Sequence, residues 1–150
     1  MKDYLDKFML ESNQIEGEHR INPGDIDAVV TVMDFGISTV EDILELHEML
    51  GGYLNKMWVG SFRKVNVRVG SYRPPNWTKV PKLMEKYMKK FSKMNSWTAH
   101  NEFEKIHPFQ DLNGRVGRII WLIKAVEEGY NFRIPFLQMY YYQTLTEYEK

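Results

Sequence analysis

Apolar positions recur every three or four residues over most of the chain, which is the spacing that places them on one face of an α-helix. The first such segment carries apolar side chains from Tyr4 to Ile15, and Gly17 is expected to end it. The second follows Pro23 and stops near Gly36. Proline fits the first turn of a helix and glycine fits the left-handed residue after its end, so these positions predict two N-terminal helices.

The same periodicity predicts further helices along the rest of the chain. Ser38 or Thr39 is expected to cap the next one, because a side-chain oxygen there accepts from an amide of the first turn. Acidic residues follow at once, where the helix dipole favours negative charge. The remaining helices are predicted over residues 81–94, 97–106, about 113–129, and after 135.

One segment, residues 60–75, departs from the helical pattern. Val65, Val67 and Val69 alternate with polar residues there, and a Gly-Ser pair follows as a turn signal. That alternation predicts a short β-hairpin. The chain has 150 residues and no repeat or linker, so the expected fold is mainly α, a single helical domain spanning 1–150 with one hairpin.

Composition narrows the function classes. The 20 basic and 20 acidic residues balance, and the missing basic excess argues against a nucleic-acid binder. The absence of cysteine excludes disulfides, thiol nucleophiles and cysteine-ligated metals. The charged N-terminal segment is unlike a signal peptide, and no apolar run approaches the ~20 residues of a membrane span. We therefore expect a cytoplasmic protein outside the membrane.

A loop between two predicted helices concentrates chemically useful side chains. Pro108 prevents the preceding helix from continuing past His107, and Asn113-Gly114 is a turn signal just before the next helix. Such a loop presents backbone amides at a helix N-terminus, which carries about half a positive elementary charge and binds phosphate. Taken singly, a histidine before proline is usually no more than a helix end, so the combination of residues carries the prediction.

Three residue types in this loop suit phosphate chemistry. Arg115 and Arg118 lie three positions apart and are expected on one helix face, where both can contact phosphate oxygens. Asp111 offers a hard carboxylate for magnesium. His107 is suited to general-base work near neutral pH. The loop thus combines an anion cradle, a metal ligand and a base.

The whole stretch, His-Pro-Phe-Gln-Asp-Leu-Asn-Gly-Arg-Val-Gly-Arg over residues 107–118, resembles the signature of the Fic family. That signature is histidine-proline-phenylalanine, a variable residue, an acid, glycine-asparagine-glycine-arginine, two variable residues and arginine. The resemblance extends over nearly the whole chain, and the hairpin corresponds to the family's flap. It implies a Fic-type domain that uses ATP and Mg²⁺ to transfer AMP to a Tyr, Ser or Thr hydroxyl of a protein.

The resemblance also assigns roles to individual positions. His107 would take the proton of the target hydroxyl, Asp111 would hold magnesium, and Phe109 would anchor the loop in the core. The backbone from residue 112 to 114 would form the anion hole and Arg118 would hold the γ-phosphate. The residues expected at the nucleotide are Leu112, Asn113, Gly114, Arg115, Arg118 and Tyr141.

A second motif lies near the N-terminus. The sequence from Ser12 to Gly17, Ser-Asn-Gln-Ile-Glu-Gly, is similar to the family's inhibitory motif, which places serine four residues before glutamate. The resemblance implies an inhibitory helix over about residues 3–17 that acts within the same chain. Glu16 would pair with Arg118 and occupy the space that the γ-phosphate needs.

The hairpin is expected to dock the protein target. An edge formed by Val69, Gly70, Ser71 and Tyr72 can pair with an extended segment through main-chain hydrogen bonds and place its hydroxyl before His107. Some related proteins are regulated by forming homo-oligomers, and the sequence leaves the oligomeric state open.

Position 112 departs from the family pattern, because most active members have glycine where this chain has leucine. A leucine with positive φ is strained, whereas glycine is not. This difference leaves open an enzyme of low activity in its wild-type form, an altered nucleotide pose, a transferase of another phosphoryl group, or an inactive Fic-like binding module. A separate alternative with the same fold is an enzyme that mainly removes AMP, with Glu16 positioning a water.

Overall fold

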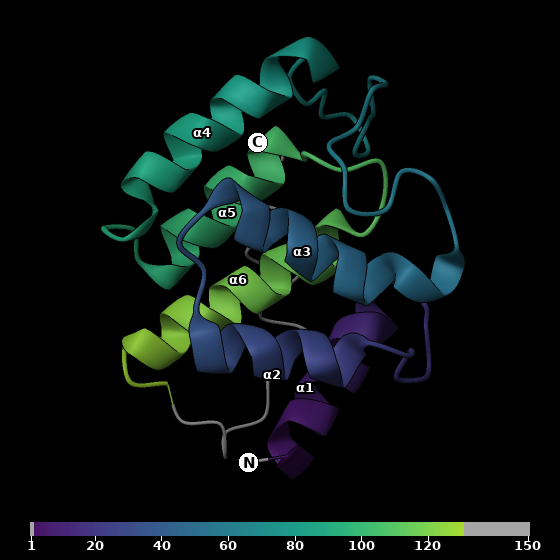
Figure 1. The fold of residues 1–150 in the computed structure, drawn as a ribbon, viewed down its shortest axis with the longest axis vertical. Helices are drawn as coiled ribbons and strands as arrows, with labels where there is room; N and C mark the ends of the chain where they lie inside the picture. The colour runs from purple at the N-terminus through teal and green to yellow at the C-terminus, as the bar shows by residue number, and fades with distance from the viewer. Residues whose placement is uncertain (1, 131–150) are drawn as a thin grey trace.

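The computed structural model describes residues 2–130, which fold almost entirely into helices (Figure 1). The α-helices are α1 (Lys2–Ile15), α2 (Asp25–Phe35), α3 (Val40–Gly51), α4 (Val80–Phe91), α5 (Ser96–Ile106) and α6 (Asn113–Glu127). Two 3-10 turns, η1 (Gly52–Leu54) and η2 (Trp77–Lys79), flank the segment between α3 and α4. The helix predicted after residue 135 lies outside the described residues.

Most predicted helix boundaries agree with the structure to within two residues, but the helix predicted over residues 81–94 ends earlier, at Phe91. Gly17 and Gly36 follow α1 and α2 with φ of 82° and 76°, values that glycine reaches without strain. Thr39 begins α3 with a reciprocal capping box: its side chain accepts from the amide of Asp42, whose carboxylate accepts from the amide of Thr39. Proline and glycine positions therefore marked most helix ends correctly.

Helix α6 lies at the centre of the molecule and packs against α5, with α1, α2 and α3 around it (Figure 1). Five of its apolar residues are fully or nearly fully buried: Val116, Ile119, Ile120, Leu122 and Ile123. A helix surrounded on most sides by other helices has little freedom to move. The N-terminus of α6, which follows the His107 loop, is therefore held at a fixed place in the fold.

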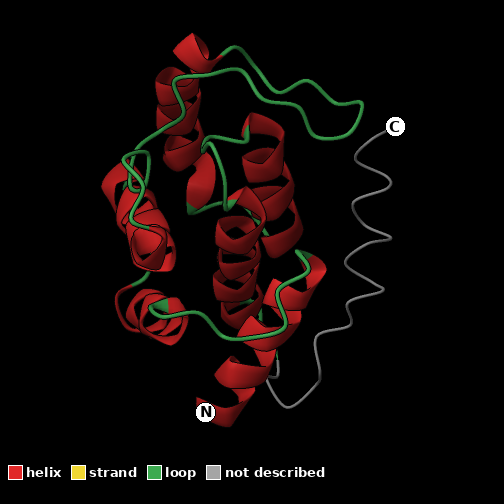
Figure 2. Ribbon diagram, turned by 90° about the vertical axis from the view of Figure 1, so that its right-hand side faces the viewer, coloured by secondary structure: helices red, strands yellow, loops and turns green. Residues whose placement is uncertain are grey.

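The flap is less regular than the sequence predicts. No residue within 2–130 lies in a β-strand, and the hairpin consists of one bridge between Val69 and Tyr72, with hydrogen bonds of 3.0 and 2.9 Å (Figure 2). A two-stranded ribbon without a third strand is only marginally stable, and Val65 is exposed instead of packed. The Tyr72 hydroxyl donates to the Lys105 carbonyl at 2.8 Å and ties the flap to α5.

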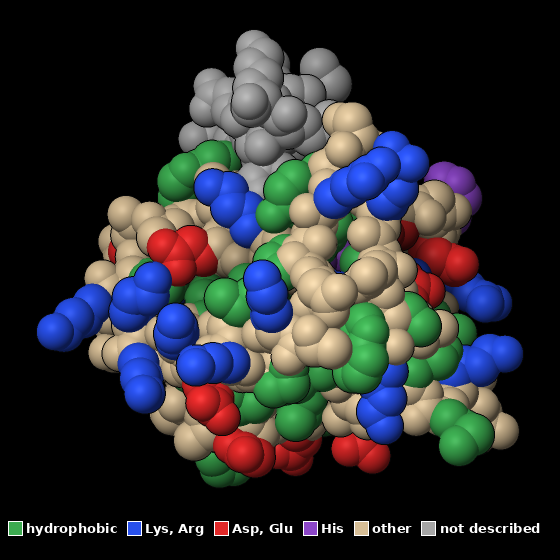
Figure 3. Space-filling view, turned by 90° about the horizontal axis from the view of Figure 1, so that it is seen from above, with side chains coloured by type: hydrophobic (Ala, Val, Ile, Leu, Met, Phe, Trp, Pro, Cys, Tyr) green, Lys and Arg blue, Asp and Glu red, His purple; other side chains and the backbone are tan. Residues whose placement is uncertain are grey.

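Charged side chains are numerous on the face of the molecule seen from above (Figure 3). Lys and Arg side chains gather toward the left of that view, with Asp and Glu side chains near them. One pair bridges neighbouring helices, since Lys90 Nζ lies 3.4 Å from a Glu102 carboxylate oxygen. In the part of the chain that the structure describes, no helix has the length and apolar character needed to cross a bilayer.

Candidate active site

Hydrogen bonds from the buried side chain of Arg63 fix the backbone turn at His107. His107 ends α5 in the left-handed region (φ 50°, ψ 62°), and its amide still donates to the Phe103 carbonyl at 2.9 Å. The Arg63 side chain donates from Nε to the His107 carbonyl at 2.7 Å and from Nη2 to the Pro75 carbonyl at 2.6 Å. Arg63 therefore fixes the His107 turn and one end of the flap together.

The loop after His107 is closed by a single side-chain amide. Asn113 Oδ1 accepts from the Phe109 amide and Asn113 Nδ2 donates to the Phe109 carbonyl, both at 2.8 Å. Phe109 is fully buried, as expected for an anchor. Both polar groups of the Asn113 side chain therefore bond within the loop. Asn113 would contribute to the predicted anion hole by shaping the backbone and not by donating from its side chain.

His47 of α3 supports the same loop from the other side. Its ring stacks on Phe109, with centroids 3.7 Å apart and planes 2° from parallel. The Gly60 amide donates to Nδ1 at 2.9 Å, so Nε2 carries the proton and donates to the Asp111 carbonyl at 3.0 Å. Burial lowers the pKa of His47 to about 4, which keeps the ring neutral at physiological pH. His47 thus fixes the backbone beside Asp111.

Leu112 takes a left-handed conformation, at the position where glycine was expected from the signature. Its φ is 69° and ψ is 12°, so the predicted strain is present. The side chain packs beside α3, where Cδ1 would be 2.9 Å from a Cβ placed on Gly51. Its amide donates to Asp111 Oδ1 at 2.7 Å. The leucine side chain is accommodated because Gly51 has no side chain. Leucine has no polar side-chain atom, so position 112 provides no hydrogen bond to cap the N-terminus of α6.

Arg118 is engaged by the N-terminal motif. Arg118 Nη2 lies 2.8 Å from Glu16 Oε1, and Arg118 Nε donates to Ser12 Oγ at 2.6 Å. The pairing between Glu16 and Arg118 that the resemblance implies is therefore present, across 102 positions of sequence. Gly114 makes this approach feasible, since a Cβ there would collide with the Glu16 carboxylate.

The end of α1, directly before Glu16, is itself anchored. Asn13 Nδ2 donates to Asp25 Oδ2 at 2.7 Å and to the Arg20 carbonyl at 2.9 Å. The same Asp25 oxygen accepts from the Asn22 amide at 2.8 Å. Burial raises the pKa of Asp25, while the hydrogen bond from Asn13 opposes that rise. These bonds hold the segment after α1 against the start of α2, within reach of α6.

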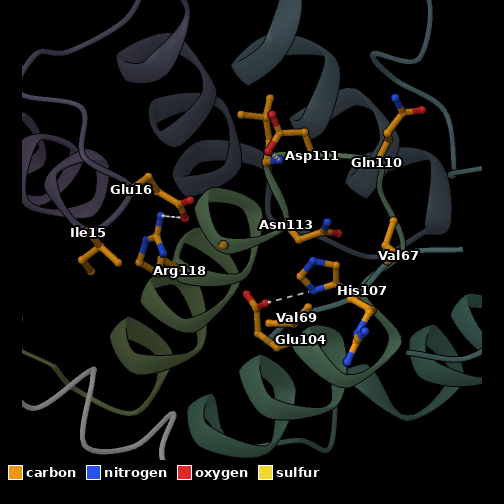
Figure 4. Close-up of a pocket in the computed structure, with 13 residues that line it drawn as sticks. Ile15, Glu16, Val67, Val69, Glu104, His107, Gln110, Asp111, Asn113 and Arg118 are labelled. Atoms are coloured by element: carbon orange, nitrogen blue, oxygen red, sulfur yellow. Dashed lines mark hydrogen bonds and ion pairs between the residues drawn. The ribbon is translucent and has the colours of Figure 1, made fainter. Parts of the chain in front are cut away.

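These elements surround a cavity of about 560 Å³ (Figure 4). Its lining includes eight residues predicted from the sequence, namely Glu16, Val69, His107, Asp111, Leu112, Asn113, Gly114 and Arg118. It also includes Glu104 and Gln110, which received no role from the sequence. Glu104 lies one helical turn before His107, and that spacing was the available signal. Gln110 occupies a variable position of the signature and gave none.

The predicted residues outside this lining divide into three groups. Arg115 does not line the cavity: its Nη1 donates to the Tyr53 hydroxyl at 3.0 Å, so its side chain turns to a different neighbour from that of Arg118. Ser12 contacts Arg118, Gly17 follows Glu16 and donates its amide to the Gln14 carbonyl, and Gly70, Ser71 and Tyr72 lie at the turn of the flap. Tyr141 lies outside the described residues.

Burial sets the protonation state of the two ionisable groups on α5. It lowers the pKa of His107 to about 4, with the Glu104 backbone partly opposing that effect, so the imidazole is neutral at pH 7. Burial raises the pKa of Glu104 to about 8, and the nearby Arg118 guanidinium partly offsets that rise. His107 Nδ1 and Glu104 Oε2 lie 3.8 Å apart. A neutral imidazole at the cavity wall can accept a proton.

Comparison with known proteins agrees with this geometry. The model of one protein family, described as the Fic/DOC family, matches residues 37–123, which contain the His107 loop, α5 and most of α6. This chain belongs to the Fic/DOC family. Membership explains why the histidine, the acid and the start of α6 occur together in one loop.

Relatives extend the comparison beyond the family model. The chain is 33% identical over 101 residues to proteins named protein adenylyltransferase Fic from Drosophila sechellia and Drosophila melanogaster. The matched region is 61% of this chain and 20% of each relative, so the chain matches about a fifth of their length.

Solved structures confirm the fold. A Fic family protein from Desulfovibrio desulfuricans G20 superposes with a TM-score of 0.71 at 24% identity, covering 99% of this chain and 56% of that one. A Fic domain containing signaling protein from Bacteroides thetaiotaomicron VPI-5482 gives 0.72 at 17% identity, covering 99% and 73%. Both likenesses extend over the whole helical body, including α1.

Proposed function

We propose that this protein transfers AMP from ATP to a hydroxyl group of a protein, and that Glu16 restrains the reaction. The observation that carries the proposal is the arrangement of His107, Asp111 and the uncapped N-terminus of α6 around one cavity. Relatives named protein adenylyltransferase support the same chemistry. The triphosphate fits this cavity because amides at a helix end and the Arg118 guanidinium both favour anions.

In the proposed reaction, His107 is the catalytic residue. The target hydroxyl oxygen attacks the α-phosphorus of ATP, the bond from that phosphorus to the bridging oxygen breaks, and pyrophosphate leaves. His107 accepts the hydroxyl proton, which its neutral ring allows at physiological pH. The first-turn amides of α6 stabilise the negative charge on the phosphate oxygens, since those amides have no partners within the helix.

The side chains present are compatible with magnesium. Within residues 2–130 no three His, Asp or Glu side chains cluster as a complete metal site. Magnesium commonly uses one or two protein carboxylates, with substrate phosphates and water completing its shell. Asp111 lines the cavity and gives one oxygen to the Leu112 amide, which leaves the other to face the nucleotide. When bound there, the ion would offset phosphate charge.

Glu16 restrains the reaction by holding Arg118, the guanidinium proposed to bind the γ-phosphate. A carboxylate and a phosphate oxygen compete for the same donor, so ATP must displace Glu16 before its triphosphate can extend along α6. The Glu16 side chain is 37% exposed, whereas that of Arg118 is 2% exposed. The glutamate is therefore the partner that can leave, while the arginine stays in place.

The test is intact-mass spectrometry of the Glu16→Gly variant after incubation with ATP and magnesium. We expect labelling of the chain or its target by one AMP, about tenfold or more above wild type, which corresponds to removing roughly 1.4 kcal/mol of competition. The matched control is Glu18→Gly, since Glu18 pairs at 3.7 Å with the exposed Arg20.

Each other outcome of this experiment selects a different function. A mass gain of one phosphate would identify a phosphotransferase. Faster loss of AMP in wild type than in Glu16→Gly, with no gain of transfer, would identify an enzyme that removes AMP. A folded variant that neither binds ATP nor gains mass would identify an inactive binding module and overturn the proposal.

A further inference from the structure

The Glu104 carboxyl group is buried in the wall of the active site without a full set of partners. It projects from α5 toward α6, where Gly117 makes room for it, because a Cβ on Gly117 would collide with Glu104 Oε1. That oxygen is buried and has no hydrogen-bond partner among the described residues. Burying a carboxyl oxygen without a hydrogen-bond partner costs free energy. The presence of Glu104 in the cavity wall is therefore best explained by the group that it faces.

The group that Glu104 faces is the catalytic imidazole. Its Oε2 lies 3.8 Å from Nδ1 of His107, one helical turn further along the chain (Figure 4). Nδ1 is also buried and makes no hydrogen bond of normal geometry within residues 2–130, although the Glu104 backbone also acts on the ring and raises its pKa. A separation of 3.8 Å is longer than a hydrogen bond, but such contacts are often long without substrate and shorten when the site is loaded.

We infer that Glu104 is a positioning residue for His107, whose carboxylate holds a proton on Nδ1 and so leaves Nε2 free to accept the proton of the target hydroxyl. This inference rests on the proposed function. In an imidazole the two nitrogens point to opposite sides of the ring, so a partner at Nδ1 decides what Nε2 can do. An acceptor at Nδ1 favours the tautomer that is a base at Nε2.

The protonation state of Glu104 then selects the tautomer of His107. As a carboxylate, Glu104 accepts from Nδ1–H and His107 is ready to act as a base. As a neutral acid, it can donate to Nδ1, which favours the tautomer with the proton on Nε2. Burial raises the pKa of Glu104 to about 8, so the carboxylate form increases as the pH rises through that value.

Several charged and titratable groups act on this pair. Arg118 of α6 lowers the pKa of Glu104 and Glu16 raises it. His100, buried on the same helix, lies beside Gly117 with Nδ1 2.8 Å from its carbonyl. Arg63 and Asp111 act on His107 with opposite signs. Removing the Glu16 charge should therefore move the ionisation of Glu104 to lower pH.

The test is nitrogen-15 NMR of the His107 ring, which reports the tautomer without ATP or a target. We expect the wild-type chain to shift from Nε2–H toward Nδ1–H between about pH 6 and 9.5, with a midpoint near 8. Glu104→Gln should lose this transition, because its amide does not ionise. In Glu16→Gly the midpoint should fall. A wild-type ring that keeps one tautomer across this range would overturn the inference, whatever the enzyme activity proves to be.

Controls separate positioning from a loss of fold. Glu102→Gln removes a carboxylate from the same helix, two residues away on its exposed side, and should keep the wild-type transition. Glu104→Asp keeps an ionising group with a shorter reach and should retain a transition of reduced amplitude. If Glu104→Gln fails to fold, the wild-type, Glu16→Gly and Glu104→Asp titrations still decide the outcome.

A kinetic measurement adds a second readout. In the Glu16→Gly background, the labelling rate should rise as the pH increases toward about 8, whereas the added Glu104→Gln substitution should leave the profile nearly flat, because an amide does not ionise. The Glu104→Gln rate at about pH 8.5 should be roughly 10- to 100-fold lower, the range seen when orienting partners of functional histidines are removed. An equal rate and an unchanged pH profile would contradict a positioning role.

Discussion

The two sides of the cavity are held in different ways. On the His107 side, the loop is supported by side chains that bond to its backbone, namely Arg63, His47 and Asn113, and all three are buried. On the Arg118 side, the guanidinium is held by side chains from the N-terminal motif, Ser12 and Glu16. The His107 loop is thus held through backbone contacts, while Arg118, the proposed anion-binding residue, is held by side chains that a bound anion would replace.

This difference indicates how the site combines stability with control. Bonds from buried side chains to backbone carbonyls have no competitor in solution, and losing one leaves a buried group unsatisfied at a cost of about 1–3 kcal/mol. The carboxylate of Glu16 is partly exposed and resembles the phosphate oxygen expected at the same place. The proposed restraint by Glu16 would therefore act on Arg118 without disturbing the geometry around His107.

The largest expected effect is on the His107 side. In the Glu16→Gly background, His107→Asn should lower AMP labelling by about 100- to 10,000-fold, the usual contribution of a general base. Asparagine is chosen because it tolerates the left-handed conformation of this position. Labelling is measured by intact-mass spectrometry, with His19→Asn on the exposed surface as control. Retained labelling would show that another group removes the hydroxyl proton.

A smaller effect is expected from acid. His47, His100 and His107 each have a pKa lowered to about 4 by burial. Between the folded and unfolded pKa values, these three histidines are therefore protonated in the unfolded chain but neutral in the folded chain. The contribution of these neutral histidines to stability is fully present above pH 6.5, the pKa of histidine in the unfolded chain, and is lost as the pH falls toward 4. Glu104, with its raised pKa, offsets part of this loss.

The net loss of unfolding free energy between about pH 7 and pH 5 should be on the order of 2–3 kcal/mol. The midpoint of urea denaturation measures it at each pH, and the exposed His19 provides a control, since His19→Gln should leave the difference unchanged. Equal midpoints at both pH values would mean that these histidines titrate normally in the folded protein.

The smallest expected effect is at Leu112, where two contributions oppose each other. Leu112→Gly removes left-handed strain of roughly 1–2 kcal/mol and also removes burial that contributes about 1.5–3 kcal/mol. The urea midpoint should therefore fall only slightly, and labelling in the Glu16→Gly background should stay equal or rise. A large fall in labelling with an intact fold would show that the leucine side chain itself shapes the nucleotide site.

Local patterns were sufficient to predict the helices and the site loop. Gly17, Gly36 and Pro108 act on their own backbone, so their effect is visible in the sequence around them. The contacts of Arg63 and His47 reach across 44 and 64 positions to backbone carbonyls, which carry no residue identity and so leave no pattern. These braces were absent from the sequence prediction for that reason.

Three other predictions show what helical spacing and family resemblance can predict and what they cannot. Arg115 was predicted beside Arg118 because three positions separate them, but long side chains on one helix face can turn to different neighbours, here Tyr53 and Ser12. The pairing of Glu16 with Arg118 is invisible to local pattern and was predicted through resemblance to the Fic family. The flap has the predicted turn but not the predicted strands, because a two-stranded ribbon is only marginally stable and no further strand within residues 2–130 pairs with it.

We propose that Glu16 and the γ-phosphate of ATP compete for Arg118. The affinities of the wild-type and Glu16→Gly chains for ATP and for ADP, measured by titration calorimetry with magnesium, test this competition. We expect the variant to gain about tenfold or more in affinity for ATP and much less for ADP, which lacks the γ-phosphate. Equal gains for both nucleotides, or no gain for ATP, would contradict it.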